Sequence, residues 1–328
     1  MAYNDLLKVR TWSVDGKKTE HITSLTQSKT WSGSYRDCAR QLRFSAVPAA
    51  MAELGGMVRL YHGADILFSG EIMLRSRDSL GQTVDCTALD NGRLLKENSL
   101  FLTVRKKTAE TVTKELCSEF GIPFGELAAT GVALSKNFLP ENIYKIIQTM
   151  YTLAAEQTGK RYQVRFLSNH LQVVEKKIGA QSLRLTPGSN LISCSSQDSI
   201  ENMITRVGVY DDDNKLTRTF DSPEGYGALY GLMQKAIRAS DSETPDKAAK
   251  TLLEENGIST TITAECMGNP KLITGNAVAV HEPVTGTDGL FWITADSHSF
   301  SNGIYHTKVS LDFRNLMDKQ EAGSLPKE

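Results

Sequence analysis

The stretch from Gly275 to Phe313 constrains the fold of this 328-residue chain more than any other segment. Its Thr, aromatic and β-branched residues alternate with small or polar ones, and turns containing glycine interrupt it at 285–289 and 301–303. Such a pattern predicts a three-stranded antiparallel meander. Asn302-Gly303 is the strongest hairpin signal within it, because a type I′ turn requires positive φ at both central residues.

A two-residue turn at 302–303 also predicts which side chains of the last hairpin share a face. One face should carry Trp292, Thr294, Asp296, His298 and Phe300 beside Tyr305, Thr307, Val309, Leu311 and Phe313. The opposite face should carry Phe291, Ile293 and Ala295 beside Ser310 and Asp312. Apolar residues on both faces indicate that one side packs against a core and that something else, such as a neighbouring subunit, covers the other.

The length and composition indicate a folded soluble protein with more than one core. A chain of this length predicts two or three domains, and 40% hydrophobic with 23% charged residues is typical of globular proteins. The 37 Lys plus Arg nearly balance the 38 Asp plus Glu, so no net field attracts nucleic acid or an anionic membrane.

The chain gives no sign of export or of membrane insertion. Its first residues lack a basic region followed by an apolar run, and no segment approaches 18 uninterrupted apolar residues, so we expect neither a signal peptide nor a membrane anchor. The five cysteines are widely spaced and odd in number, which predicts buried thiols in a reducing cytoplasm; they are Cys38, Cys86, Cys117, Cys194 and Cys266.

Residues 1–97 predict an N-terminal β domain. Six short strands at this spacing suggest a small barrel or a tight sandwich. The turns between them are expected at Asp15-Gly16, Ser32-Gly33, Gly55-Gly56, His62-Gly63 and Leu80-Gly81. The candidate strands are Leu6–Ser13, Thr19–Gln27, Ala39–Val47, Met57–His62, Ile66–Arg75 and Thr83–Leu89.

Residues 98–187 predict a small α/β domain. Thr108 can cap a helix that runs to Phe120, with Gly121 as its stop. Pro140 begins a longer helix to about Gln157, which Gly159 ends. Two strands should follow, Arg161–Leu167 and His170–Glu175, joined by Ser168-Asn169.

Residues 188–318 predict a second β domain, which makes the chain α+β and mainly β. Its strands are expected at Leu191–Ser196, Met203–Asp211, Lys215–Phe220 and Ile258–Cys266, ahead of the meander. An insertion at about 222–257 interrupts it, and Thr244-Pro245 opens a helix there that stops at Gly257. The charged residues 319–328 predict a flexible C-terminal tail.

Asp296 and His298 form the most site-like cluster, because they share a strand face two residues apart. His281 and His306 lie on neighbouring strands. A zinc site needs three or four ligands around one point, and an acid–base pair needs a cleft. The expected register sends His306 to the face opposite His298, so hydrogen bonding at the strand end is favoured over metal binding or catalysis.

Two other motifs partly match known binding loops, one for dinucleotides and one for calcium, but each lacks required residues. Gly225–Gly231 has Tyr230 where a dinucleotide loop needs its third glycine, which indicates a turn with close backbone packing. Asp211–Asn214 has Leu216 and Ser222 at the calcium-loop positions for Gly and Glu, which indicates a solvated hairpin turn. The sequence therefore predicts no catalytic, cofactor-binding or metal-binding residue and no cofactor.

Several stretches together resemble the tail-hub proteins of contractile-tailed phages and related prophage particles, the late-control-D or XkdQ-like family. Their order and spacing make the resemblance specific over most of the chain. They are Thr30–Arg36 with Arg40–Ser45; Thr87–Asn91; Phe120–Pro123; Ile143-Tyr144 with Glu156–Lys160; Tyr226–Leu229; and Gly275–Val278 through to Asn302–Tyr305.

The resemblance implies two tube-like β-barrel domains per chain and a homotrimer whose six barrels form a pseudo-sixfold ring without catalysis. This baseplate hub would join the tail tube protein to the central spike protein. Baseplate wedge or LysM-type baseplate proteins and the tape-measure protein are the further partners implied, and DNA would pass only in transit through the channel. The implied location is a virion or a tail-like bacteriocin particle, assembled in the host cytoplasm.

Two other functions remain open from the sequence. One is a cell-wall (peptidoglycan) hydrolase that acts through the Asp296/His298 region or through an unrecognised pair of carboxylates. The other is a carbohydrate-binding module of the tail tip that uses an exposed Trp31 or Trp292. The lack of a coherent set of active-site residues favours the structural role. The near-zero net charge favours it too, because a strongly basic channel would hold DNA phosphates.

Overall fold

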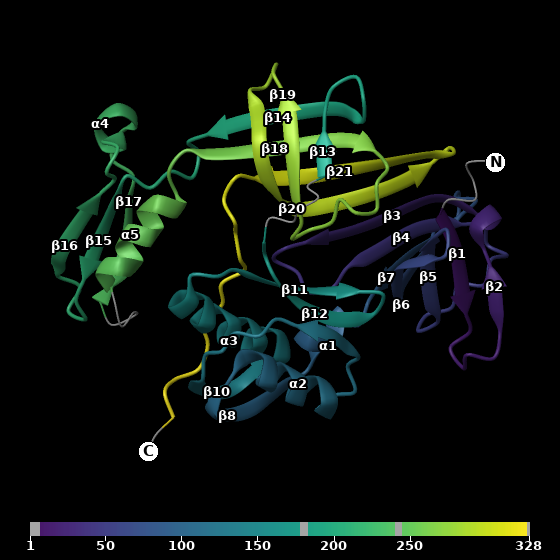
Figure 1. Ribbon diagram of the computed structural model, residues 1–328, viewed down its shortest axis with the longest axis horizontal. Coiled ribbons are helices and arrows are strands. Elements are labelled where there is room, and N and C mark those ends of the chain that lie inside the picture. The colour runs from purple at the N-terminus through teal and green to yellow at the C-terminus, as the bar shows by residue number, and fades with distance from the viewer. Residues whose placement is uncertain (1–6, 178–182, 240–244, 327–328) are drawn as a thin grey trace. The chain divides into compact units, whose positions relative to one another are not determined.

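The computed structural model describes residues 7–177, 183–239 and 245–326 and divides the chain into two compact units. The first unit contains the residues up to Cys194 and those from Thr263 onwards, and the second contains Ser195–Ile262. Figure 1 shows the helices and strands of both units with their labels. The protein is mainly β, as the sequence predicts.

A 13-stranded sheet runs through the first unit in the order β14-β18-β21-β20-β3-β4-β7-β6-β5-β1-β2, with β19 paired to β20 and to β13. The path is open, since no pairing between described strands links β2 back to β14. The N-terminal strands are β1 (Leu7–Trp12), β2 (Thr19–His21), β3 (Thr26–Ser34), β4 (Gln41–Ala46), β5 (Met57–His62), β6 (Asp65–Arg77) and β7 (Val84–Leu89). The later strands are β13 (Leu183–Leu185), β14 (Leu191–Ser199), β18 (Ser259–Met267), β19 (Ala277–Glu282), β20 (Thr287–Ser301) and β21 (Ile304–Asp312).

The N-terminal and C-terminal strands meet where β3 pairs with β20. The pairing is antiparallel and continuous from Ala295↔Ser34 to Ser301↔Ser28 (Figure 1). Trp31 of β3 packs in the same hydrophobic cluster as Phe300 and Tyr305 of the last hairpin. Strands from residues 1–97 and from residues 188–318, which the sequence predicts to lie in separate β domains, therefore pair in one sheet and contribute to one hydrophobic cluster.

The three-stranded meander is confirmed, and so is its turn. Asn302 and Gly303 have φ of 52° and 79°, as a type I′ turn requires. Phe300↔Tyr305, His298↔Thr307 and Asp296↔Val309 pair as predicted. Beyond Ala295 the predicted register is wrong, because an irregularity at Thr294 pairs Ile293 with Leu311 and Trp292 with Asp312. Ile293, and not Trp292, therefore shares the face of Asp296.

The structure confirms most N-terminal strands but not the predicted turn at Ser32-Gly33. Both residues lie within β3 and pair with Ser297 and Asp296 of β20. The short helix η2 (Thr23–Leu25) divides the predicted strand Thr19–Gln27 into β2 and the start of β3. A glycine fits inside β3 because the side chain of Arg40 occupies the space where a Cβ of residue 33 would stand.

The middle of the chain packs three helices against two small sheets. α2 (Ala109–Glu119) and the hairpin of β11 (Tyr162–Leu167) and β12 (His170–Glu175) follow the prediction, with positive φ at Ser168 and Asn169. β8 (Ser99–Lys107), α1 (Gly92–Glu97) and β9 (Phe124–Leu127) were not predicted. The longer helix α3 (Ile143–Thr158) begins later than expected, because β10 (Leu134–Asn142) continues through Pro140 and Asn142 caps the helix by accepting from the Lys145 N–H.

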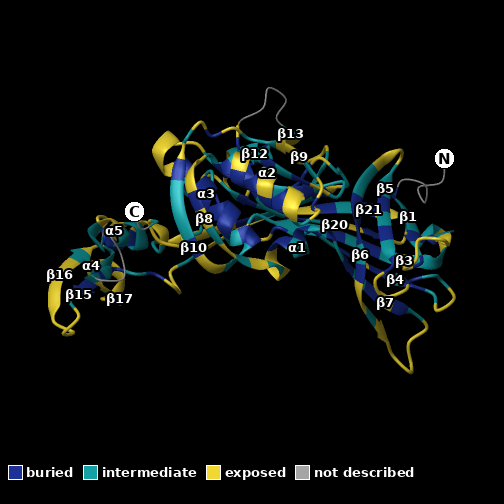
Figure 2. Cartoon of the chain, turned by 90° about the horizontal axis from the view of Figure 1, so that it is seen from below, coloured by how far each residue is buried: buried dark blue, intermediate teal, exposed yellow. Residues whose placement is uncertain are grey.

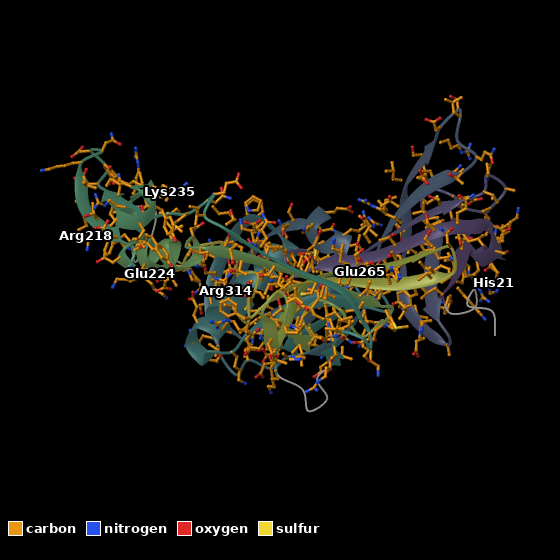
Figure 3. The ribbon with its side chains drawn as sticks, turned by 90° about the horizontal axis from the view of Figure 1, so that it is seen from above. His21, Arg218, Glu224, Lys235, Glu265 and Arg314 are labelled. Carbon is orange, nitrogen blue, oxygen red and sulfur yellow. The ribbon has the colours of Figure 1, made fainter. Side chains whose placement is uncertain are left out.

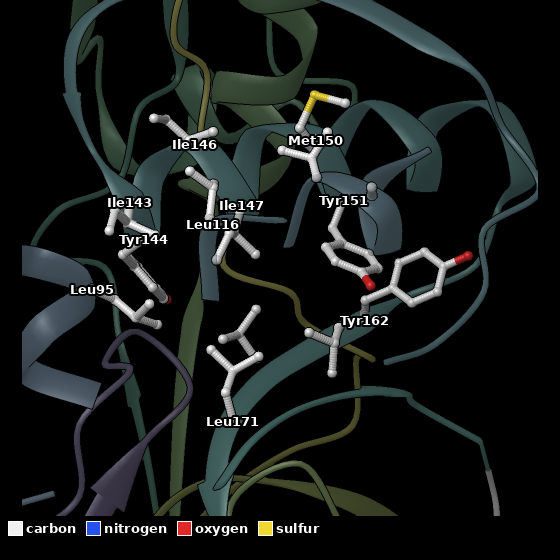
Figure 4. Close-up of a cluster of buried hydrophobic side chains, with 14 of the residues drawn as sticks. Leu95, Leu116, Ile143, Tyr144, Ile146, Ile147, Met150, Tyr151, Tyr162 and Leu171 are labelled. Atoms are coloured by element: carbon white, nitrogen blue, oxygen red, sulfur yellow. The ribbon is translucent and has the colours of Figure 1, made fainter. Parts of the chain in front are cut away.

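A hydrophobic cluster around α3 forms the core of this middle region (Figure 4). Ile143, Ile146, Ile147 and Met150 of α3 are fully buried, and Figure 2 shows the helix largely in the colour of buried residues. The helix ends at Gly159, whose φ of 72° is the left-handed conformation expected of a C-terminal glycine. α3 has 16 residues, and no helix in the described ranges has the length and apolar character needed to cross a bilayer.

Besides the ends of β14 and β18, the second unit contains a three-stranded sheet, ordered β16-β15-β17, with α5 packed on it. β15 (Arg206–Tyr210) and β16 (Leu216–Asp221) form the predicted hairpin, and α5 (Pro245–Glu255) is the predicted helix. β17 (Gln234–Arg238), which pairs parallel to β15, and α4 (Tyr226–Tyr230) were not predicted. Figure 3 labels Arg218 of β16 and Lys235 of β17 among the exposed charged side chains of this unit.

The C-terminal residues pack on the middle region, where the sequence predicts a flexible tail. Asn137 of β10 exchanges two backbone hydrogen bonds with Ser324, of 2.7 and 2.8 Å. Tyr144 and Gln148 of α3 bond to the side chain and the backbone of Asp318. The described part of this segment, up to Pro326, is therefore held along β10 and α3.

Candidate functional site

Asp296 and His298, which the sequence predicts to share a strand face, lie in a buried polar cluster that also contains Arg40. Arg40 lies just before β4 and reaches Asp296 of β20 with both terminal nitrogens; Nη1 is 3.1 Å from Oδ1, and Nη2 pairs with Oδ2. Its guanidinium lies over the ring of Trp31, 4.1 Å from the ring centroid. The bidentate pair joins residues from the two ends of the chain.

Backbone and hydroxyl groups complete the shell around the Asp296 carboxylate. Thr274 donates from its backbone N–H and from its hydroxyl to Oδ1, at 2.7 and 2.6 Å. Burial alone would raise the pKa of Asp296, but the charge of Arg40 and the bonds from its neighbours outweigh burial and hold the pKa below its usual value. Asp296 is therefore a permanent anion whose charge Arg40 balances.

His298 lies beside Asp296 and completes the buried network. Its Nε2 is 3.3 Å from Asp296 Oδ2, and its Nδ1 is 3.0 Å from the Tyr305 hydroxyl and 3.1 Å from that of Thr307. The imidazole also packs against Trp31, with ring centroids 4.7 Å apart. We name the set of Trp31, Arg40, Thr274, Asp296, His298, Tyr305 and Thr307 the seam network.

The seam network is closed to solvent. The side chains of Asp296 and His298 are 0% and 1% exposed, and neither described pocket has either residue in its lining. A carboxylate beside an imidazole has the composition of an acid–base pair, but such a pair must come within hydrogen-bonding reach of its substrate. The seam network can therefore stabilise the pairing of β3 with β20.

The other histidines do not join Asp296 and His298. His281 of β19 lies 3.2 Å from Asp288, and His306 of β21 lies 3.1 Å from Glu265 of β18, and all four side chains are more than a third exposed. As predicted, His306 is opposite Ser299 and points away from His298. No three His, Cys, Asp or Glu side chains converge on a point suited to a metal ion in the described ranges.

The remaining sequence motifs form ordinary structural elements. The 211–214 segment is the predicted hairpin turn, with Asn214 at φ 62°. Gly225–Gly231 is not a closely packed turn: it forms α4, and Gly225 and Gly231 have open space where a Cβ would stand and positive φ. Trp31 and Trp292 are buried, so the prediction that one of them is exposed for binding sugar is wrong.

Two buried charged residues, Arg40 and Lys29, are not predicted from the sequence. Arg40 stands 256 residues from Asp296, and no local pattern links them. Lys29 is buried on the same face of β3 as Trp31, at 3% exposure. The sequence does indicate the burial of Lys29, since the alternation of a strand along 27–31 places residue 29 on the same face as the aromatic residue 31.

Comparison with known proteins identifies the family. The model of the YQBQ-like family matches residues 29–312, so the chain belongs to the YQBQ-like family. The uncharacterized protein YqbQ of Bacillus subtilis (strain 168) is 22% identical over 94% of this chain and 96% of its own length. The phage-like element PBSX protein XkdQ of the same strain is 23% identical over 76% and 79%. The predicted resemblance to the XkdQ-like family is confirmed.

Solved structures with a similar fold include two tail proteins and a chain of a PdpA–VgrG complex. The 43 kDa tail protein of prophage MuSo2 from Shewanella oneidensis has a TM-score of 0.70 at 12% identity, covering 93% of this chain and 98% of its own. The tail protein from Neisseria meningitidis MC58 has a TM-score of 0.65 at 14% identity, over 93% and 96%. A chain of the Francisella PdpA–VgrG complex has a TM-score of 0.56 at 12% identity, over 98% of this chain and 54% of its own.

Proposed function

We propose that this protein is a structural component of the baseplate of a phage tail or tail-like particle, and that it acts as the hub. The observation that carries the proposal is the fold: it matches that of a prophage tail protein over 93% of this chain and 98% of the other. The relative XkdQ, from the phage-like element PBSX, supports the same setting.

The finer arrangement that we propose is a homotrimer that joins the tail tube protein to the central spike protein. Residues 1–97 and 188–318 would serve as two tube-like domains around the 98–187 domain, and the 222–257 segment would be an insertion in the second of them. The direct pairing of β3 with β20 supports a rigid pair of such domains in each chain. Three chains would then present six similar surfaces to the tube.

Exposed apolar side chains support burial between subunits. Phe101 of β8 and Leu139 of β10 are 73% and 66% exposed. Further large apolar side chains exposed on the first unit are Leu74, Leu80, Val284, Ile304 and Phe313. Phe101 and Leu139 lie on the paired strands β8 and β10, and a contact with another subunit would cover them.

The partners proposed beyond the trimer are the tail tube, the spike, wedge or LysM-type baseplate proteins and the tape-measure protein. The fold shared with a chain of the PdpA–VgrG complex supports a place in an assembly of several proteins. The formal net charge of −1 suits a channel through which DNA passes without being held. The particle would be assembled in the bacterial cytoplasm.

The proposed role needs no catalysis. The sealed seam network supports this, because a hydrolase acting through Asp296 and His298 would have to admit a glycan to side chains that are almost entirely covered. The burial of Trp31 and Trp292 likewise argues against a sugar-binding platform.

Mass measurement and imaging test the proposal together. We expect the purified 36.1 kDa chain to form a species of three times its mass, or a complex with the tube protein that contains three copies, and to appear as a ring in negative-stain images. Antibody labelling should place it at the baseplate end of particles from the producing strain. A chain that remains monomeric with the tube protein and is absent from particles, or one that digests peptidoglycan, would overturn the proposal.

A further inference from the structure

A pocket of about 370 Å³ opens beside the tip of the last hairpin, at the end of the first unit where β3 begins. It is lined by Thr23, Ser24, Thr26, Gln27, Lys29, Phe300, Asn302 and Gly303, and most of these residues are polar. Its position is fixed by strand pairing, since Lys29 pairs with Phe300 and Ser28 with Ser301. We name it the Lys29 pocket.

Lys29 is the one charged residue of this lining, and it is buried. Its neighbours across the sheet are Phe300 of β20 and Phe44 of β4, and its ammonium lies over the Phe300 ring, 4.7 Å from the centroid. A lysine at the edge of a core normally extends its ammonium into water. Only 3% of Lys29 is exposed, so its side chain is covered except where it lines the pocket.

No carboxylate or carbonyl receives a hydrogen bond from the Lys29 ammonium among the described residues. Burial alone lowers its pKa to about 8, and no neighbouring charge contributes. Lys176, the other deeply buried lysine, shows the contrast: its Nζ donates to the backbone oxygen of Leu316 at 2.7 Å, besides lying over Trp292. A buried cation without an acceptor is costly, and such groups in folded proteins are normally paired.

The rest of the lining supplies neutral hydrogen-bond donors. Ser24, Gln27 and Asn302 line the pocket and are exposed, so a hydroxyl and two amides are accessible in the lining. One positive charge balances a monoanion, whereas a phosphate dianion usually meets several cationic donors. A planar carboxylate offers two oxygens, one for the ammonium and one for the neutral donors.

We propose that the Lys29 pocket binds a carboxylate group, with the Lys29 ammonium as its counter-ion and Ser24, Gln27 and Asn302 as further donors. The carboxylate belongs to a small organic acid or to an acidic residue of a neighbouring polypeptide. The proposal is independent of the tail assignment, because it rests on the burial and the missing partner of one side chain.

The experiment follows Lys29 directly in the full-length protein. Lysine labelled with ¹³C at Cε gives one signal per residue, and the Lys29→Met variant identifies that of Lys29. Sodium acetate is added against sodium chloride at constant ionic strength. We expect the Lys29 signal to shift saturably and its titration midpoint to rise from about 8 towards the usual lysine value of about 10.4. Lys308→Met, which removes an exposed lysine on β21, should leave the response unchanged.

Two further experiments test where the carboxylate comes from and whether the neutral donors contribute to binding. N-acetyl-aspartyl amide replaces acetate in a parallel titration; saturation by this probe alone assigns the site to an acidic residue of a polypeptide, and saturation by acetate shows that a free acid suffices. Gln27→Leu and Ser24→Ala should weaken binding several-fold while Lys29 keeps its depressed midpoint. The proposal fails if neither probe produces a saturable change, or if chloride produces the same one.

Discussion

Arg40 and Asp296 lie 256 residues apart in the sequence and form a two-pronged ion pair in the interior of the first unit. The pair lies at the line where β3 meets β20, with Trp31 on one side and the backbone N–H of Thr274 on the other. Removing one partner would leave the other as an uncompensated buried charge. The seam network is thus expected to hold the two β regions together.

Asp296→Asn should therefore lower the free energy of unfolding by about 3–5 kcal/mol, the usual cost of breaking a buried ion pair. The reason is that Arg40 would keep its charge and lose its counter-ion. Urea unfolding followed by tryptophan fluorescence measures the change, and Trp12, Trp31 and Trp292 all report on the first unit.

The matched control for this substitution is Glu115→Gln, which breaks the exposed pair with Lys107 and should cost less than about 1 kcal/mol. The double variant Arg40→Met with Asp296→Leu should lose less than the sum of the single losses, because no lone charge remains. Additive losses would show that the two residues do not act as a pair.

His298→Ala should destabilise the protein without removing any reaction. The imidazole packs on Trp31 and bonds to hydroxyls of Tyr305 and Thr307, so its loss leaves a cavity and two unpaired groups, which together cost about 2–4 kcal/mol. Thermal unfolding and a peptidoglycan turbidity assay check both parts. His281→Ala, at an exposed position of β19, should change neither, and a turnover lost with His298 while folding is intact would contradict the structural role.

Lys29→Met should stabilise the protein in chloride buffer, and the gain should depend on pH. Burial lowers the pKa of Lys29 to about 8 in the folded chain, whereas in the unfolded chain it is about 10.4. Below pH 8 the wild type carries the full cost of the buried charge, about 3 kcal/mol for a shift of about 2.4 pKa units at about 1.4 kcal/mol per unit.

Between pH 8 and about 10.4 the unfolded chain binds the extra proton, so the stability of the wild type rises and the advantage of the Lys29→Met variant shrinks. Urea unfolding of both proteins at pH 7, 8.5 and 10 measures this trend. An advantage that stays constant over that range would show that Lys29 does not titrate as the structure indicates.

Removing residues 323–328 should free the edge of β10 without unfolding α3. The amide of Asn137 then loses its 2.7 Å bond to Ser324, so its hydrogen exchange should accelerate strongly, while amides within α3 keep their protection. Mass-spectrometric hydrogen exchange resolves the two segments. Leu325→Ala, at an exposed position, is the control that should leave both unchanged. Equal exchange at Asn137 in the deleted and the complete chain would contradict this packing.

The sequence predicts those parts of the fold whose causes are local. Asn302-Gly303 forms the predicted turn because both residues tolerate positive φ, and Gly159 ends α3 for the same reason. The hairpin at 168–169 and helix α5 likewise depend on neighbouring residues alone. Local turn and cap chemistry is sufficient for these elements.

Features set by distant residues escape such analysis. Ser32-Gly33 has the composition of a turn, yet it lies inside β3 because β20 pairs with it and Arg40 fills the space beside Gly33. The irregularity at Thr294 reverses the face of Trp292 and leaves no trace in the alternation of the sequence. Asp296 and His298 could be named as neighbours, but their counter-ion Arg40 could not.

The pairing of β3 with β20 also has a consequence for the order of synthesis. When β3 leaves the ribosome, its partner lies more than 250 residues downstream; Arg40 precedes Asp296 by 256 positions. At about 5–20 residues per second, one edge of β3 waits roughly 10–50 seconds for β20. A message broken before codon 287 yields chains whose sheet keeps that edge bare, and bare edges recruit other nascent chains into aggregates.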